Sequence, residues 1–139
     1  VSLARWRNEA PCRETTGNLV RPDGHGLWVT GAHRVPFWLE MDLGTETLTR
    51  VARKLTGYAH LAGTRHGYPV LFWLPTAVRE ANLRTHLART GVPDGVTVAM
   101  ASDDNGDADG PAGAVWRVPG HPGPIRLADL PGTAPGGAP

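Results

Sequence analysis

The stretch "FWLEMDLGTETLTRVARKLTGYAHLAGTRHGYPVLFWLP", residues 37–75, decides the fold class. It starts with apolar and polar residues in alternation, continues with apolar residues at helical spacing, and ends in an unbroken apolar run between two prolines. These patterns predict a strand, then an amphipathic helix over residues 44–63, then a strand buried on both faces. Because a helical crossover typically joins two parallel strands, this order predicts an α/β fold.

Upstream of this stretch, the sequence predicts a hairpin and a short helix. The segments 25–31 and 34–42 are apolar and β-branched, with a short turn between them, and residues 18–23 predict a further short strand. Residues 2–10, "SLARWRNEA", have apolar residues near helical spacing, and Pro11 would end that helix.

Downstream, residues 76–91 predict a second amphipathic helix and residues 95–102 a further strand. The resulting order α-β-β-β-α-β-α-β predicts a mixed central sheet with helices on both faces. We expect residues 1–101 to form the folded domain, and residues 102–139 to comprise a flexible acidic loop, a short strand and a Gly/Pro-rich tail.

The composition of the 139 residues restricts the protein class only loosely. The formal net charge of +1 supports no strong electrostatic conclusion, although four aspartates in 102–110 leave the rest of the chain basic. One cysteine excludes an internal disulfide, and no apolar run reaches the roughly 20 residues needed to span a bilayer. We therefore expect a cytoplasmic domain, and the start at Val1 without a signal peptide suggests a piece cut from a longer protein.

Two carboxylates inside the strand over residues 34–42 are the main functional signal. Alternation places Glu40 and Asp42 on one face with Trp38, and puts the neighbouring apolar residues on the other face. A half-exposed strand with a solvated polar face would show the same alternation. Trp38 on the same face and the apolar residues on the other argue against a solvated face, and both interpretations stay open on this pattern alone.

Asp23, in "RPDG", can approach the same face from a neighbouring strand end, although it also suits a simple turn. Carboxylates that converge repel one another and call for a cation, and hard oxygen ligands suit Mg²⁺ or Mn²⁺. Lys54 lies in the next helix with Arg50 and Tyr58 one turn away on each side. It is a candidate for balancing negative charge on a phosphodiester, and a solvated helix face is the alternative.

The order "PD", then E-x-D, then K-x-x-x-Y resembles the restriction-endonuclease-like PD-(D/E)XK fold with its αβββαβ core. More narrowly, "LARWRNE", "RPDG", residues 37–61 and "PVLFWLP" resemble the replication-relaxation family, over roughly residues 3 to 90. That resemblance implies a protein of bacterial plasmids and mobile elements, often with a DNA-binding region ahead of this domain. No such region is visible in this chain.

The resemblance also implies roles for individual residues. Asp23 and Glu40 would bind the metal, with Glu9 beside it and Asp42 completing its shell. Asp42 stands where the superfamily pattern has lysine, and Lys54 would replace that lysine from the helix.

The expected function is therefore magnesium-dependent hydrolysis or nicking of DNA. Arg50, Arg53 and Tyr58 would bind the nucleic acid. The alternative is a catalytically inactive module of the same fold that binds DNA or a replication or conjugation protein.

Overall fold

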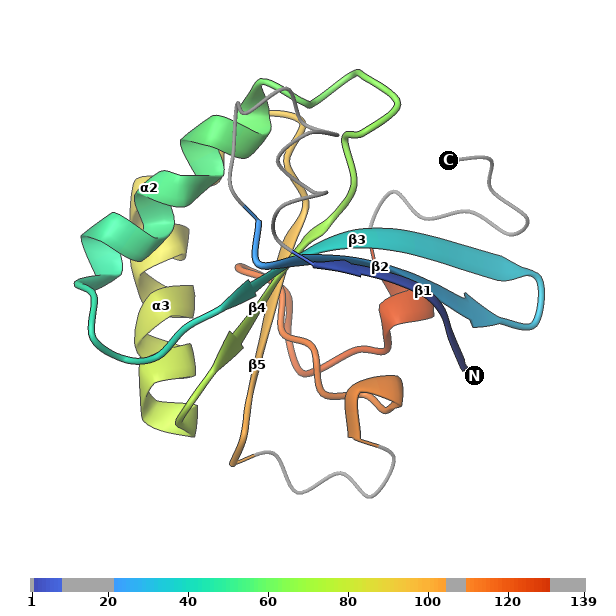
Figure 1. Ribbon diagram of the computed structural model, residues 1–139. Helices are drawn as coiled ribbons and strands as arrows, with labels where there is room; N and C mark the ends of the chain where they lie inside the picture. Colours follow the sequence, from blue (N-terminus) through green and yellow to red (C-terminus); the bar gives the residue numbers. More distant parts are fainter. Residues whose placement is uncertain (1, 9–21, 105–109, 131–139) are drawn as a thin grey trace.

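The computed structural model describes residues 2–8, 22–104 and 110–130, and its centre is a five-stranded sheet in the order β1-β2-β3-β4-β5 (Figure 1). The first three strands pair antiparallel, whereas β3–β4 and β4–β5 pair parallel. This mixed sheet with its helices confirms the predicted α/β fold class. The strands are β1 (Ser2–Asn8), β2 (Gly24–Thr30), β3 (His33–Met41), β4 (Val70–Leu74) and β5 (Val98–Ser102).

Two helices provide the crossovers, α2 (Leu48–Ala59) between β3 and β4 and α3 (Ala77–Thr90) between β4 and β5. Each begins at a threonine whose side-chain oxygen accepts a backbone N–H three residues on, Thr47 for α2 and Thr76 for α3. Neither is long and apolar enough to cross a membrane, and the same is true of any helix in the described ranges.

Both helices cover the same face of the sheet, which corrects the prediction of helices on both faces (Figure 1). The steps β3→β4 and β4→β5 run in one direction across the sheet. Because such crossovers are right-handed, two steps in one direction place both helices on one side. The order of the strands, which the sequence pattern does not reveal, decides this outcome.

The other face of the sheet is covered by residues 110–130, which contain two short 3-10 helices, η1 (Gly110–Ala112) and η2 (Leu127–Asp129). Their apolar side chains share a core with Phe37 and Leu71. The backbone of Arg117 also exchanges two hydrogen bonds of 2.9 Å with Met100 of β5. The C-terminal segment is therefore part of the packed structure.

The predicted N-terminal helix is wrong, since residues 2–8 form β1 and pair antiparallel with β2 from Ser2↔Val29 to Asn8↔Gly24. Pairing with the open edge of β2 supplies backbone hydrogen bonds that override a weak local preference for helix. Glu9 and most of the strand predicted over residues 18–23 lie outside the described residues.

Candidate functional site

Glu40, near the end of β3, is the centre of a buried polar site on the helix-covered face. Glu40 is only 4% exposed to solvent. The Tyr58 hydroxyl donates a hydrogen bond of 2.7 Å to Oε1, and the Lys54 ammonium lies 3.9 Å from Oε2. Tyr58 and Lys54 stand one turn apart on α2, so one helix face supplies both contacts.

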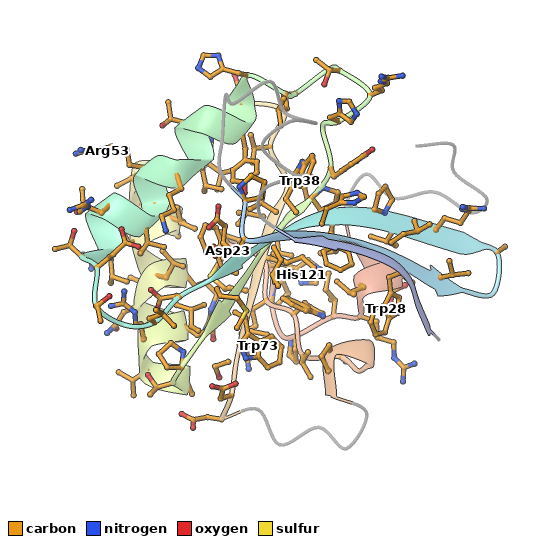
Figure 2. The ribbon with its side chains drawn as sticks, viewed as in Figure 1. Asp23, Trp28, Trp38, Arg53, Trp73 and His121 are labelled. Carbon is orange, nitrogen blue, oxygen red and sulfur yellow. The ribbon has the colours of Figure 1, made fainter. Side chains whose placement is uncertain are left out.

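Asp23 lies beside the same part of β3 and is hydrogen-bonded to it (Figure 2). Its backbone N–H donates to the carbonyl of Leu39 at 3.0 Å, and its Oδ2 accepts the N–H of Met41 at 2.8 Å. These two bonds flank Glu40 in sequence. The Asp23 carboxylate thereby lies near enough to Glu40 for its negative charge to raise the pKa of Glu40.

The pKa of Glu40 is raised to about 7, first because burial disfavours the charged carboxylate. The hydrogen bond from Tyr58 and the charge of Lys54 lower this pKa, whereas the Asp23 carboxylate raises it. Glu40 therefore exchanges a proton near neutral pH. A cation at the pair would displace that proton.

Lys54 joins two acids. Its ammonium donates to Glu46 Oε1 at 2.9 Å and also faces Glu40. Burial works against the charged ammonium, but the hydrogen bond to Glu46 and the attraction of Glu40 raise its pKa above the ordinary value. Lys54 consequently keeps its positive charge beside Glu40.

Asp42 lies on the same strand face but is bound by Arg79 of α3. The Arg79 Nε donates to one carboxylate oxygen of Asp42, and Nη2 donates to the other at 2.9 Å. Nη2 also donates to the carbonyl of Glu46 at 2.7 Å. Burial would raise the pKa of Asp42, but the hydrogen bonds from Arg79 and the Gly44 backbone lower it. Arg79 thereby ties the β3–α2 loop to α3.

Sequence reasoning missed Arg79 although a signal was present. Arg79 lies in the first turn of the helix that follows β4. The ends of parallel strands meet at one edge of the sheet, so this turn adjoins the end of β3 where Asp42 lies. A basic residue at that point can pair with an acid at the end of the neighbouring strand.

The remaining predicted residues lie in other surroundings. Arg50 and Arg53 are exposed on α2, and the Nε of Arg50 lies 3.8 Å from Oε2 of Glu46. Tyr58 is 3% exposed, so its side chain serves the interior of the site instead of the surface. Glu9 is outside the described residues.

The donor set suits a loosely held hard cation. Across residues 2–8, 22–104 and 110–130, no three histidine, cysteine, aspartate or glutamate side chains converge as a metal-binding group. Asp23 and Glu40 form a pair of neighbouring carboxylates from two different segments. Mg²⁺ commonly binds through one or two carboxylates and completes its shell with water and substrate phosphate, so the pair fits this ion.

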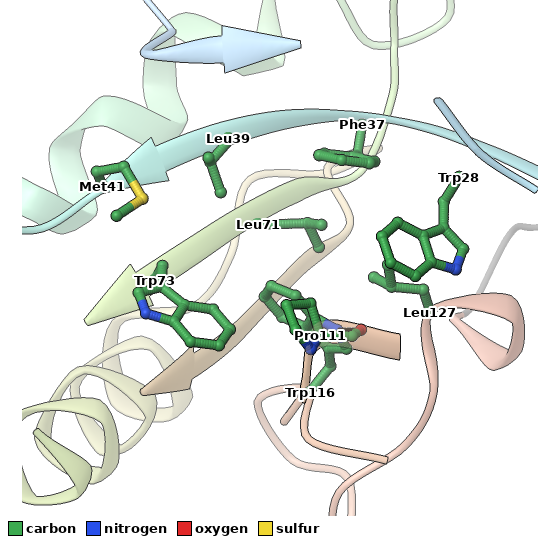
Figure 3. Close-up of a pocket in the computed structure, with 9 residues that line it drawn as sticks. All are labelled: Trp28, Phe37, Leu39, Met41, Leu71, Trp73, Pro111, Trp116 and Leu127. Carbon is green, nitrogen blue, oxygen red and sulfur yellow. Dashed lines mark hydrogen bonds between the residues drawn. The ribbon is translucent and has the colours of Figure 1, made fainter. Parts of the chain in front are cut away.

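An apolar pocket of about 260 Å³ lies on the opposite face, between the sheet and the C-terminal segment (Figure 3). The indole N–H groups of Trp73 and Trp116 are bound to Asp103 and to the carbonyl of Pro111. The pocket therefore offers packing surface and no group for acid–base or metal chemistry. It is lined by Trp28, Phe37, Leu39, Met41, Leu71, Trp73, Pro111, Trp116 and Leu127.

Comparison with known proteins gives one result. No curated protein and no solved structure matches this chain significantly. Residues 1–70, half of the chain, match the replication-relaxation family over β1, β2, β3 and α2, which include the whole Asp23–Glu40–Lys54 arrangement. The chain therefore belongs to the replication-relaxation family.

Proposed function

We propose that this domain is a magnesium-dependent, restriction-endonuclease-like DNA nuclease that hydrolyses or nicks phosphodiesters in the replication of a plasmid or other mobile element. The proposal is supported chiefly by the closeness of Asp23, Glu40 and Lys54, which come from three separate segments. The Lys54 ammonium nitrogen lies 3.9 Å from Oε2 of Glu40. Two acids beside a lysine supply a metal-binding pair and a positive charge for a phosphodiester.

In this proposal, Asp23 and Glu40 hold the ion, which when bound would polarise the phosphate and lower the pKa of an attacking water. The Tyr58 hydroxyl fixes the Glu40 carboxylate, and the Lys54 ammonium balances charge that develops on the phosphate. Asp42 would act through Arg79 by holding the β3–α2 loop, not as a ligand.

The inactive DNA-binding or partner-binding module is the second candidate, and the contact between Lys54 and Glu46 favours it. At 2.9 Å, Glu46 holds the ammonium more closely than Glu40 does. A lysine retained by Glu46 would stabilise the loop and leave the phosphate without its positive charge.

A nicking assay on supercoiled plasmid separates the two candidates. With 5–10 mM Mg²⁺ or Mn²⁺, on the order of the weak affinity expected for a two-carboxylate site, the wild type should produce open circles, and EDTA should stop the reaction. Glu40→Gln and Lys54→Met should each remove nicking. Arg65→Ala, at an exposed position in the loop between α2 and β4, is the matched control and should nick like the wild type.

Thermal unfolding with the same ions tests metal binding by itself. A ligand that binds only the folded state raises the melting temperature, and Asp23→Asn should remove that rise. A metal-dependent rise without nicking would favour the inactive module. If the metal ions cause neither a rise in melting temperature nor nicking, the nuclease proposal is rejected.

A further inference from the structure

A second polar groove of about 460 Å³ lies between the later turns of α3 and the chain around residue 121, outside the Asp23–Glu40 site. None of its lining side chains is acidic, and three of them carry or can acquire positive charge. We call it the α3 groove. It is lined by Arg84, Thr85, Ala88, Arg89, Gly120, His121 and Pro122.

A buried acid orients Arg84, one of the two arginines that line this groove. Glu80 is 5% exposed, and its Oε2 accepts a hydrogen bond of 3.0 Å from Arg84 Nε. The Nε of Arg117 lies 3.8 Å from the other oxygen. The side chains of Arg84 and Arg117 are 30% and 36% exposed, so each keeps access to solvent. The hydrogen bond to Glu80 also fixes the position of Arg84. An arginine held in this way loses less conformational freedom when it binds an anion.

The charge near the groove is clearly positive. Arg84, Arg89 and Arg117 outweigh the single charge of Glu80. Arg84 and Arg89 are five residues apart on α3, and both line the groove, so two guanidinium groups border one opening.

The other end of α3 carries the opposite charge. The Asp104 carboxylate accepts the N–H of Ala77 at 2.8 Å, and Asp103 binds the indole of Trp73. These two carboxylates disfavour a nucleic-acid backbone at the beginning of α3 and leave the groove at its later turns as the more favourable place.

We propose that the α3 groove binds the phosphodiester backbone of DNA without reading its sequence, with Arg84 and Arg89 contacting phosphates. This rests on the proposed function only in taking DNA as the partner, since binding here requires neither metal nor hydrolysis. Arginine forks suit phosphate oxygens, and no phenylalanine, tyrosine or tryptophan lines the groove to stack on bases.

The test is fluorescence anisotropy of a labelled DNA duplex with the 139-residue chain in EDTA, over a series of KCl concentrations. Arg89→Ala and Arg84→Gln should each weaken binding several-fold, and each should reduce the slope of log affinity against log salt by about one. Arg89→Glu should weaken it further. Arg34→Ala removes an exposed arginine from the hairpin at the start of β3, and should leave affinity and slope nearly unchanged.

Three results would overturn the proposal: no DNA binding by the wild type, equal losses in the Arg34 and Arg89 variants, or inorganic pyrophosphate binding as tightly as the duplex. The last result would assign the groove to a small phosphate ligand. A groove that binds DNA in a protein that never nicks would reject the nuclease while retaining this site.

Discussion

The two faces of β3 differ in chemistry although they belong to one strand. Trp38 and Glu40 face the helices, where Tyr58 and Lys54 complete a charged, hydrogen-bonded site. Phe37, Leu39 and Met41 face the C-terminal segment, where the pocket is apolar. Alternation along a strand therefore lets a protein place a site for chemistry and a purely packed layer back to back, with only the thickness of the sheet between them.

The largest expected contrast between the faces comes from two neighbours on β4, each 1% exposed. Phe72 belongs to the helix-side core, and Leu71 lines the pocket on the other face. Phe72→Ala should lower the free energy of unfolding by about 3–5 kcal/mol, and Leu71→Ala by about 2 kcal/mol, because a side chain beside an existing pocket has fewer contacts to lose. Urea denaturation of both variants measures the difference. A larger loss in Leu71→Ala would show that the C-terminal segment packs the tighter face.

The next contrast concerns the pH dependence of stability. Glu40 has a pKa of about 7 in the folded state against 4.5 without burial, so the folded state binds more protons between these values. Wild-type stability in EDTA should therefore fall as pH rises from about 4.5 to 7, by on the order of 3 kcal/mol. Glu40→Gln should remove this fall and be the more stable protein at pH 8.

Tyr58→Phe serves as the comparison for that experiment. It removes a hydrogen bond that lowers the pKa of Glu40, so the loss of stability should extend to higher pH than in the wild type. If the free energy of unfolding depends on pH in the same way in the wild type and in Glu40→Gln, the pKa of Glu40 is not raised by folding.

The smallest contrast uses Asp42, two residues further along the same face. Arg79→Gln removes the cation paired with the Asp42 carboxylate, whose side chain is only 3% exposed. The substitution should lower the free energy of unfolding by about 2 kcal/mol at pH 7. The figure is below that of a fully buried pair because Arg79 is 19% exposed. Asp42→Asn combined with Arg79→Gln should recover part of the loss. Full additivity of the two single changes would exclude a direct pairing.

Unfolding at acidic pH is a second test of the pairing between Asp42 and Arg79. The pKa of Asp42 is lowered in the folded state, so its contribution to stability is present above its ordinary value of 3.8. This contribution is lost as pH falls through the lower folded-state pKa. Arg79→Gln should therefore differ less from the wild type near pH 3 than at pH 7.

Local sequence pattern predicted the elements that depend on local periodicity. The run 44–63 contains α2, residues 76–91 contain α3, and the apolar run between Pro69 and Pro75 is β4. Alternation also placed Trp38, Glu40 and Asp42 on one face, since a side-chain period of two leaves no freedom.

Features that depend on partners distant in sequence could not be read in this way. β1 exists because β2 offers an open edge, and the common face of the two helices follows from strand order. The neutralisation of Asp42 needs Arg79, 37 residues further on. Such pairings are set by the assembled fold, and local periodicity does not show them. The place of Arg79 in the first turn after β4 becomes a signal only when the pairing of β3 with β4 is considered.

The paired backbones of Met100 and Arg117 affect solubility as well as folding. An uncovered outer strand presents free N–H and C=O groups to which a second molecule can add its own strand. Arg117 occupies part of that row on β5 and brings a charged side chain to it. Shortening the protein before residue 110 would expose both this edge and the apolar layer beneath it, so such a fragment is expected to self-associate into β-rich aggregates.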